Sequence, residues 1–148
     1  MISIFIEDVV FKLHNKRIHK KWLHEIAEKN KKKVGKLNII FCSDQYIQSL
    51  NKKFLKHDYC TDVISFDYPN LYSKGKIVGD IFISIDTVNI NAQLYNVTFH
   101  DELLRVIAHG LLHLLAYKDC TKKQGIIMRK EEENAIILYK KLTNKNIN

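Results

Sequence analysis

The chain has 148 residues and a formal net charge of +8 at pH 7, with 46% hydrophobic and 27% charged residues. This length suits one domain with a continuous buried core, and the composition is ordinary for a soluble globular protein. No run approaches the roughly eighteen apolar residues of a membrane span, and the first apolar stretch lacks the features of a signal peptide, so we expect a cytoplasmic protein.

Runs of β-branched and aromatic residues predict about four strands, and apolar residues at helical spacing predict about five helices. In chain order the sequence predicts a strand at 2–10, a helix at 16–33, a strand at 36–43, a helix from 44 to about 54, strands at 61–68 and 77–84, and helices at 87–94, 98–117 and from about 126 to 142. No repeat or Pro/Gly-rich hinge interrupts the chain, so these elements form one domain of mixed α and β structure.

Several residues mark the helix ends. Gly35 follows the first helix and is expected to end it. Ser43 or Asp44 can cap the second helix, and Thr98 with Asp101 resembles a capping box before the long apolar helix. The last helix is amphipathic, and we expect its buried face to consist of Ile126, Ile127, Ala135, Ile136 and Leu142.

Positive charge is concentrated in residues 12–36, which carry ten Lys and Arg side chains against Glu25 and Glu28. That surplus equals the net charge of the whole chain. A basic stripe of this kind attracts polyanions such as RNA, or an anionic membrane surface. Lysine-rich faces are also common on ordinary solvated helices, so the stripe is either a binding face or a solvent-facing surface.

Two histidines stand four residues apart in the segment HGLLHLLAYKD, residues 109–119. On a helix this spacing places His109 and His113 side by side on one face, where they can hold one metal ion. Asp119, six residues further on, can supply a third ligand where the chain leaves the helix, and Cys120 is an alternative donor. Three protein ligands leave one coordination position open, which is typical of a catalytic site.

The same segment resembles the HGxLHLxGYDH signature of the YbeY family of bacterial zinc-dependent endoribonucleases, which cut single-stranded RNA in ribosomal RNA maturation. Residues 50–66, LNKKFLKHDYCTDVISF, resemble the family's LNxxYRxKDxPTDVLSF, and residues 79–84, GDIFIS, resemble its GDIxIS. The resemblance covers most of the chain from Leu50 to Tyr117. It implies an α+β fold, with a single zincin-like domain over residues 1–148.

The resemblance also implies a metal-dependent hydrolase with one Zn²⁺ ion per chain. His109, His113 and Asp119 are the expected metal ligands and catalytic residues. The expected partners are single-stranded RNA, chiefly ribosomal RNA, and ribosomal subunits, with a role in ribosome quality control in the cytoplasm; neither DNA nor a membrane is expected. The candidate substrate-binding residues are Lys53, Lys56, His57 and Ser65.

Three positions depart from the family pattern. Asp119 replaces the family's third histidine and keeps a donor, but it leaves a bound metal less electrophilic than a neutral histidine would. Ala116 replaces a glycine and must either stay helical or adopt a left-handed conformation, which costs about 1 kcal/mol or more. Leu55 replaces an arginine, so any phosphate contact in this region must come from neighbouring basic residues.

Three other functions fit part of this pattern. Zinc peptidases of the HExxH type share the ligand spacing, but Gly110 stands where their general-base glutamate would stand. Two histidines and one carboxylate also form the facial triad of non-haem iron oxygenases, although no arginine signature for a cosubstrate is recognisable. The third is a non-catalytic RNA-binding partner of the ribosome, in which a metal only fixes the last helices.

Overall fold

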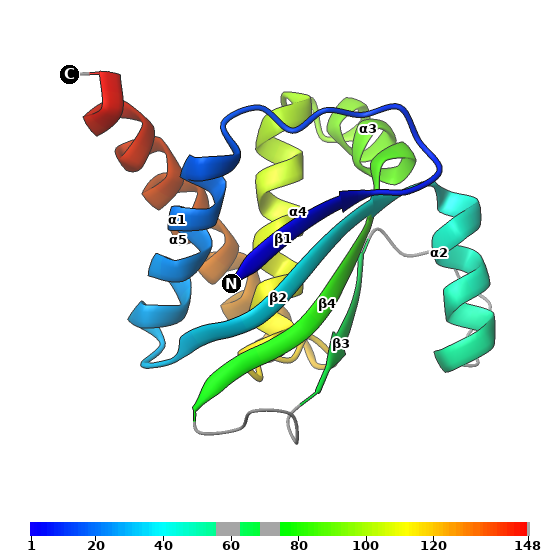
Figure 1. Cartoon of the computed structure of the whole chain (residues 1–148), viewed down its shortest axis with the longest axis horizontal. Helices are drawn as coiled ribbons and strands as arrows, with labels where there is room; N and C mark the ends of the chain where they lie inside the picture. Colours follow the sequence, from blue (N-terminus) through cyan, green and yellow to red (C-terminus); the bar gives the residue numbers. More distant parts are fainter. Residues whose placement is uncertain (56–62, 69–74, 148) are drawn as a thin grey trace.

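The computed structural model describes residues 1–55, 63–68 and 75–147 and confirms the α+β class (Figure 1). Within these ranges the chain forms four strands, five α-helices and one short π-helical segment. In chain order the elements are β1 (Ile2–Ile6), α1 (Lys16–Lys29), β2 (Lys33–Cys42), α2 (Asp44–Leu50), η1 (Asn51–Leu55), β3 (Val63–Asp67), β4 (Lys76–Ser84), α3 (Ile85–Leu94), α4 (Phe99–Leu114) and α5 (Lys122–Ile147). None of the helices in these ranges has both the length and the apolar content needed to cross a bilayer.

The four strands form one mixed sheet in the order β1-β2-β4-β3. The strands β1, β2 and β4 are parallel, and β3 pairs antiparallel with β4, where Ser65 lies opposite Ile81. The strand β3 therefore lies at one edge of the sheet, with β4 as its neighbour.

One face of the sheet is covered by helices, and this face holds the main hydrophobic core. Alternate residues of β2, Leu37, Ile39 and Phe41, are fully or almost fully buried there. The helix α4 packs against β3 and β4, α1 packs against β2, and α5 packs against both helices (Figure 1). Because α4 has the sheet on one side and α5 on the other, it is apolar around most of its surface.

The close approach of α4 to the sheet depends on a residue without a side chain. A Cβ added at Gly110 would lie 2.6 Å from Cγ2 of Ile81 and 3.0 Å from Cγ2 of Val63. Position 110 therefore faces the sheet, and no larger residue fits there without moving the helix.

Several element ends differ from the sequence-based prediction. The helix α1 ends at Lys29, not near residue 33, because Lys31 adopts a left-handed conformation (φ 60°) and β2 begins at Lys33. Gly35 thus lies within a strand, where pairing with β4 overrides the expected helix stop. The first strand ends at Ile6, the last residue that pairs with β2.

The buried face of α5 also differs from the prediction. Ile126 and Ile127 are 64% and 46% exposed, although Ala135 and Leu142 are buried as expected. The buried stripe instead consists of Met128, Glu132, Ala135, Tyr139 and Leu142. These residues follow the helical period, so α5 buries a carboxylate in the middle of its contact with α1 and α4.

Candidate metal centre

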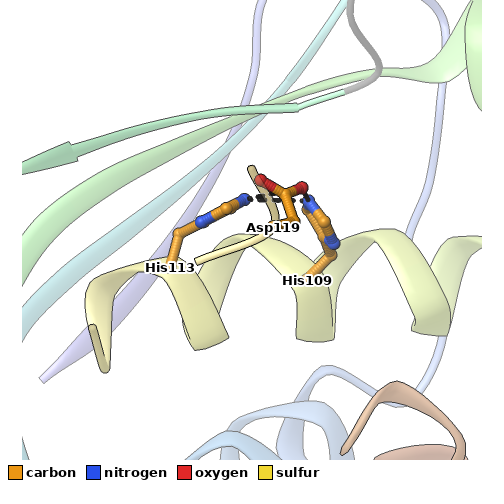
Figure 2. Close-up of side chains that lie close together, drawn as sticks. All are labelled: His109, His113 and Asp119. Atoms are coloured by element: carbon orange, nitrogen blue, oxygen red, sulfur yellow. Dashed lines mark hydrogen bonds and ion pairs between the residues drawn. The ribbon is translucent and has the colours of Figure 1, made fainter. Parts of the chain in front are cut away.

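The predicted ligands lie together above the C-terminal half of α4 (Figure 2). The Nε2 atoms of His109 and His113 are 2.9 Å apart, and Oδ2 of Asp119 lies 3.3 Å from the first and 3.6 Å from the second. Ligand atoms around a tetrahedral zinc ion with bonds of about 2.0 to 2.1 Å are about 3.3 Å apart. The three donors therefore form a triangle of the size that one face of such a site requires.

The other ring nitrogens of the two histidines have hydrogen-bond acceptors as partners. Nδ1 of His109 lies 2.6 Å from Oε2 of Glu132, and Nδ1 of His113 lies 3.1 Å from the carbonyl oxygen of Tyr117. Because an ionised carboxylate and a carbonyl accept hydrogen bonds, we assign the proton of each ring to Nδ1, which leaves a lone pair on each Nε2. This is the arrangement in which metal-binding histidines are normally held.

Two lone pairs that face each other across 2.9 Å repel unless a proton or a cation lies between them. Burial lowers the pKa of His113, and the neighbouring ring of His109 lowers it further, so the site disfavours the proton. A cation between the rings relieves the repulsion, and the carboxylate of Asp119 adds the anionic donor that a divalent metal prefers. The residues present thus fit a metal ion.

The turn after α4 brings Asp119 back to the histidines. Ala116 adopts the left-handed conformation, with φ at 74°. Its N–H donates to the carbonyl of His113, and the N–H of Tyr117 donates to that of Leu112, which is the hydrogen-bond pattern of a Schellman motif. This left-handed residue ends α4 at Leu114, three residues earlier than the sequence predicts. The side chain of Asp119 is 42% exposed, so the donor triangle is accessible from solvent.

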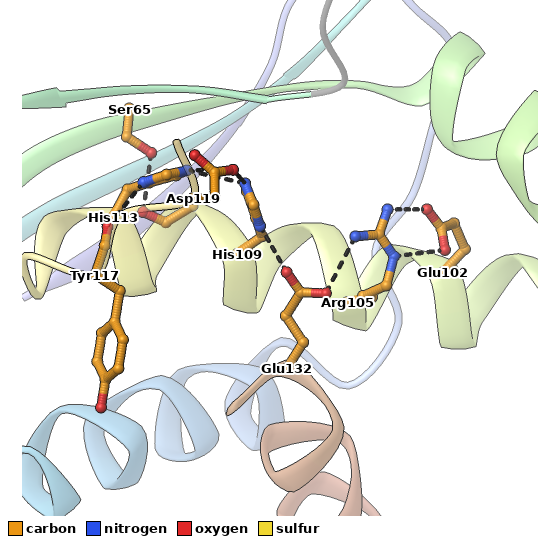
Figure 3. A network of polar contacts seen from close by, with 9 residues as sticks. Ser65, Glu102, Arg105, His109, His113, Tyr117, Asp119 and Glu132 are labelled. Atoms are coloured by element: carbon orange, nitrogen blue, oxygen red, sulfur yellow. Dashed lines mark hydrogen bonds and ion pairs between the residues drawn. The ribbon is translucent and has the colours of Figure 1, made fainter. Parts of the chain in front are cut away.

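A chain of charged side chains supports the site from behind: Glu102 and Glu132 are buried, and Arg105 between them is partly exposed (Figure 3). Oε1 of Glu132 accepts a hydrogen bond of 3.2 Å from Nη1 of Arg105. The same guanidinium donates through Nε and Nη2 to the two oxygens of Glu102, at 2.9 and 2.5 Å. Glu132 does not stand out in the sequence because it lies among three consecutive glutamates. Its place on the apolar stripe between Met128 and Ala135 is the signal that could have identified it.

The remaining candidate residues are less closely tied to the triangle. The Ser65 hydroxyl donates to the carbonyl of Gly110 at 2.9 Å, which ties the edge strand β3 to α4 beside the site. Lys53 is exposed on η1. Lys56 and His57 lie outside the described residues. Cys120 is exposed, and among the described residues the metal-ligand grouping contains Asp119 and not this thiol.

Comparison with known proteins places the chain in a family. Residues 4–140 match the family model described as Endoribonuclease YbeY. A protein of that name from Cytophaga hutchinsonii is 51% identical over 94% of this chain and 96% of its own length, and one from Flavobacterium johnsoniae is 39% identical over 91% and 95%. The solution structure of TM1509 from Thermotoga maritima is 29% identical and covers 99% of this chain and 93% of its own, with a TM-score of 0.64. The chain therefore belongs to the YbeY family.

Proposed function

We propose that this protein is a zinc-dependent endoribonuclease that cuts single-stranded RNA in ribosomal RNA maturation and ribosome quality control. Its relatives over almost the whole chain carry the name Endoribonuclease YbeY, which supports a hydrolase acting on RNA. The structural observation that supports the role of a metal is the triangle formed by His109, His113 and Asp119. We further propose that the protein works in the cytoplasm in contact with ribosomal subunits.

The three donors and their partners define what each ligand does in this proposal. A zinc ion held there supplies Lewis-acid activation of a water molecule toward a phosphodiester. His109 and His113 bind through Nε2 because their Nδ1 protons are engaged by Glu132 and Tyr117. Asp119 neutralises part of the ion's charge and, being partly exposed, leaves room for RNA on the solvent side.

Basic residues of the chain are suited to binding the phosphates of RNA. Lys53, Lys56 and His57 are the proposed phosphate contacts, and Ser65, which joins β3 to α4, is a further proposed substrate contact. The Ser65 hydroxyl proton is held by the Gly110 carbonyl, so its oxygen is left to accept from the substrate. The exposed lysines within residues 12–36 add a positive field that attracts a polyanion.

The structure also bears on the peptidase alternative. Position 110, where HExxH peptidases carry their general base, faces Ile81 and Val63 in the sheet. A glutamate at this position has no space beside the metal ligands, so Gly110→Glu is expected to disrupt packing rather than to create a peptidase. This geometry favours the nuclease.

The proposal is tested with a labelled single-stranded RNA and a labelled unstructured peptide. We expect RNA cleavage that stops on addition of a chelator and is lost, by at least a hundredfold, in His113→Ala, because two remaining donors bind zinc poorly. His14→Ala, which changes an exposed histidine, serves as the matched control and should cleave normally.

Three outcomes would contradict the proposal. Cleavage that persists in both the chelator and His113→Ala indicates a contaminating nuclease. Chelator-sensitive peptide hydrolysis without action on RNA indicates a peptidase. RNA binding without cleavage by the zinc-loaded protein indicates a non-catalytic binder.

A further inference from the structure

We infer that Glu132 is a positioning residue for His109, acting through the ring's Nδ1 from the neighbouring helix α5. The inference rests on the proposed metal site and assigns a function to a carboxylate that lies 23 residues away in sequence. Glu132 touches neither the proposed metal position nor the substrate. It acts by holding the imidazole that does.

Both oxygens of Glu132 are engaged as acceptors. Oε2 accepts from Nδ1 of His109 at 2.6 Å, and Oε1 accepts from Arg105 at 3.2 Å. The side chain is only 5% exposed, so water does not compete for these oxygens. The short contact fixes the tautomer and the orientation of the His109 ring. Only one orientation of the ring about its Cβ–Cγ bond keeps Nδ1 on this oxygen.

The charges around Glu132 add a second effect. In their ionised forms, Glu102, Arg105 and Glu132 carry a net charge of −1. The guanidinium makes two of its contacts to Glu102, so the negative charge of Glu132 is only partly balanced by Arg105 and is directed at His109. A carboxylate behind a histidine makes Nε2 a stronger donor to a metal. An ion pair that only joined α4 to α5 would need Arg105 and Glu132 alone. It would not need the contact between Glu132 and His109.

The two histidines differ in this respect, and the difference provides an internal control. His113 has a neutral backbone carbonyl at Nδ1, whereas His109 has a carboxylate. A change at Glu132 should therefore alter the ring of His109 more than the ring of His113, on which Glu132 acts only through its charge at a distance.

The matched variants are Glu132→Gln and Glu133→Gln. Each removes one negative charge from the same turn of α5, but Glu133 is exposed. A glutamine at 132 has one oxygen for two donors, so its amide N–H faces either His109 or Arg105. We expect the zinc dissociation constant, measured by competition with a chromogenic chelator, to rise 10- to 100-fold for Glu132→Gln and less than twofold for Glu133→Gln.

Nuclear magnetic resonance of the imidazole rings supplies a second readout that needs no variant. In the zinc-loaded parent we expect the Nδ1 proton of His109 to resonate further downfield than that of His113 and to exchange slowly with water, because its acceptor is a buried carboxylate. In Glu132→Gln the His109 signal should move upfield, by more than any shift of the His113 signal.

The outcomes separate this inference from the proposed function. A parent protein that binds no zinc overturns the proposed metal site itself. A parent that binds zinc, with an affinity equal in Glu132→Gln, overturns only the positioning role and leaves Glu132 as a structural ion-pair partner. If Glu132→Gln fails to fold, fast exchange of the His109 Nδ1 proton in the parent still overturns the inference.

Discussion

The part of the chain that the structure describes contains two pairs of close histidines, and one of the two resembles a metal site. The Nε2 atoms of His109 and His113 are 2.9 Å apart, and those of His19 and His100 are 3.3 Å apart. One ring of each pair also has its Nδ1 on a backbone carbonyl, that of Tyr117 for His113 and that of Asn15 for His19. The difference between the pairs must therefore lie in their surroundings.

The first pair is surrounded by carboxylates and the second by aromatic rings. Asp119 and Glu132 contact the first pair. The ring of Tyr139 lies 4.9 Å from that of His19 and 5.2 Å from that of His100, measured between centroids. Within the described residues, only the first pair belongs to a group of three potential ligands. The carboxylate of Asp119 is the third potential ligand that distinguishes the first pair from the second among the described residues.

The position along α4 adds to this contrast. His100 lies in the first turn, where the helix dipole disfavours positive charge, whereas His113 lies in the last turn, where the dipole favours it. The helix dipole therefore favours a cation beside His113 and disfavours protonation of His100.

The largest expected effect is on metal content. His109→Ala and His113→Ala should each reduce bound zinc from about one ion per chain to nearly none. The two remaining ligands bind the ion too weakly to retain it when the protein is diluted. His100→Ala, from the other pair, should keep the full amount. The measurement is elemental analysis after gel filtration. Full zinc content in either site variant, or its loss in His100→Ala, would remove the distinction between the pairs.

The second prediction concerns pH and the aromatic pair. Burial lowers the pKa of both His19 and His100, and the carboxylate of Asp101 and the ammonium of Lys140 act on His100 in opposite directions. The folded state therefore binds fewer protons than the unfolded chain below the ordinary histidine pKa of about 6.5. This part of the stability is fully present above that pH and is lost as the pH falls toward the lowered folded pKa values.

The test is the free energy of urea unfolding of the metal-free protein between pH 7.5 and about pH 5. We expect this free energy to decrease as the pH is lowered. The slope of the free energy against pH should be smaller in His100→Ala by up to about 1.4 kcal/mol per pH unit, the value for one proton. His113, whose pKa is also lowered, contributes equally to both proteins and cancels. An identical slope in the two proteins would show that the aromatic pair does not titrate on unfolding.

The smallest expected effect concerns the turn that returns Asp119 to His109 and His113. Ala116→Gly should raise the free energy of unfolding by about 1 kcal/mol, because glycine adopts positive φ without the Cβ penalty. Ala108→Gly, in the interior of α4, is the matched control and should lower it by a similar amount or more. Urea unfolding measures both changes. Destabilisation by Ala116→Gly would show that the turn is held without strain.

Local pattern was enough to predict much of this architecture. The helical period alone places His109 and His113 on one face of α4, and the Thr98 side chain accepts from the N–H of Asp101, as its position at the start of α4 predicts. The number of strands and the α+β class follow in the same way from residue periodicity. These features depend on neighbours within a few residues, which a sequence displays directly.

Only the packing of distant elements decided the rest. Which face of α5 is buried depends on where α1 and α4 lie, so Glu132 became a partner of His109 while Ile126 and Ile127 remained exposed. The return of Asp119 likewise required Ala116 to adopt a left-handed conformation that its residue type disfavours. A periodic pattern identifies the faces of a helix, but the free energy of burying a carboxylate depends on the charged and polar partners that the tertiary structure brings to it.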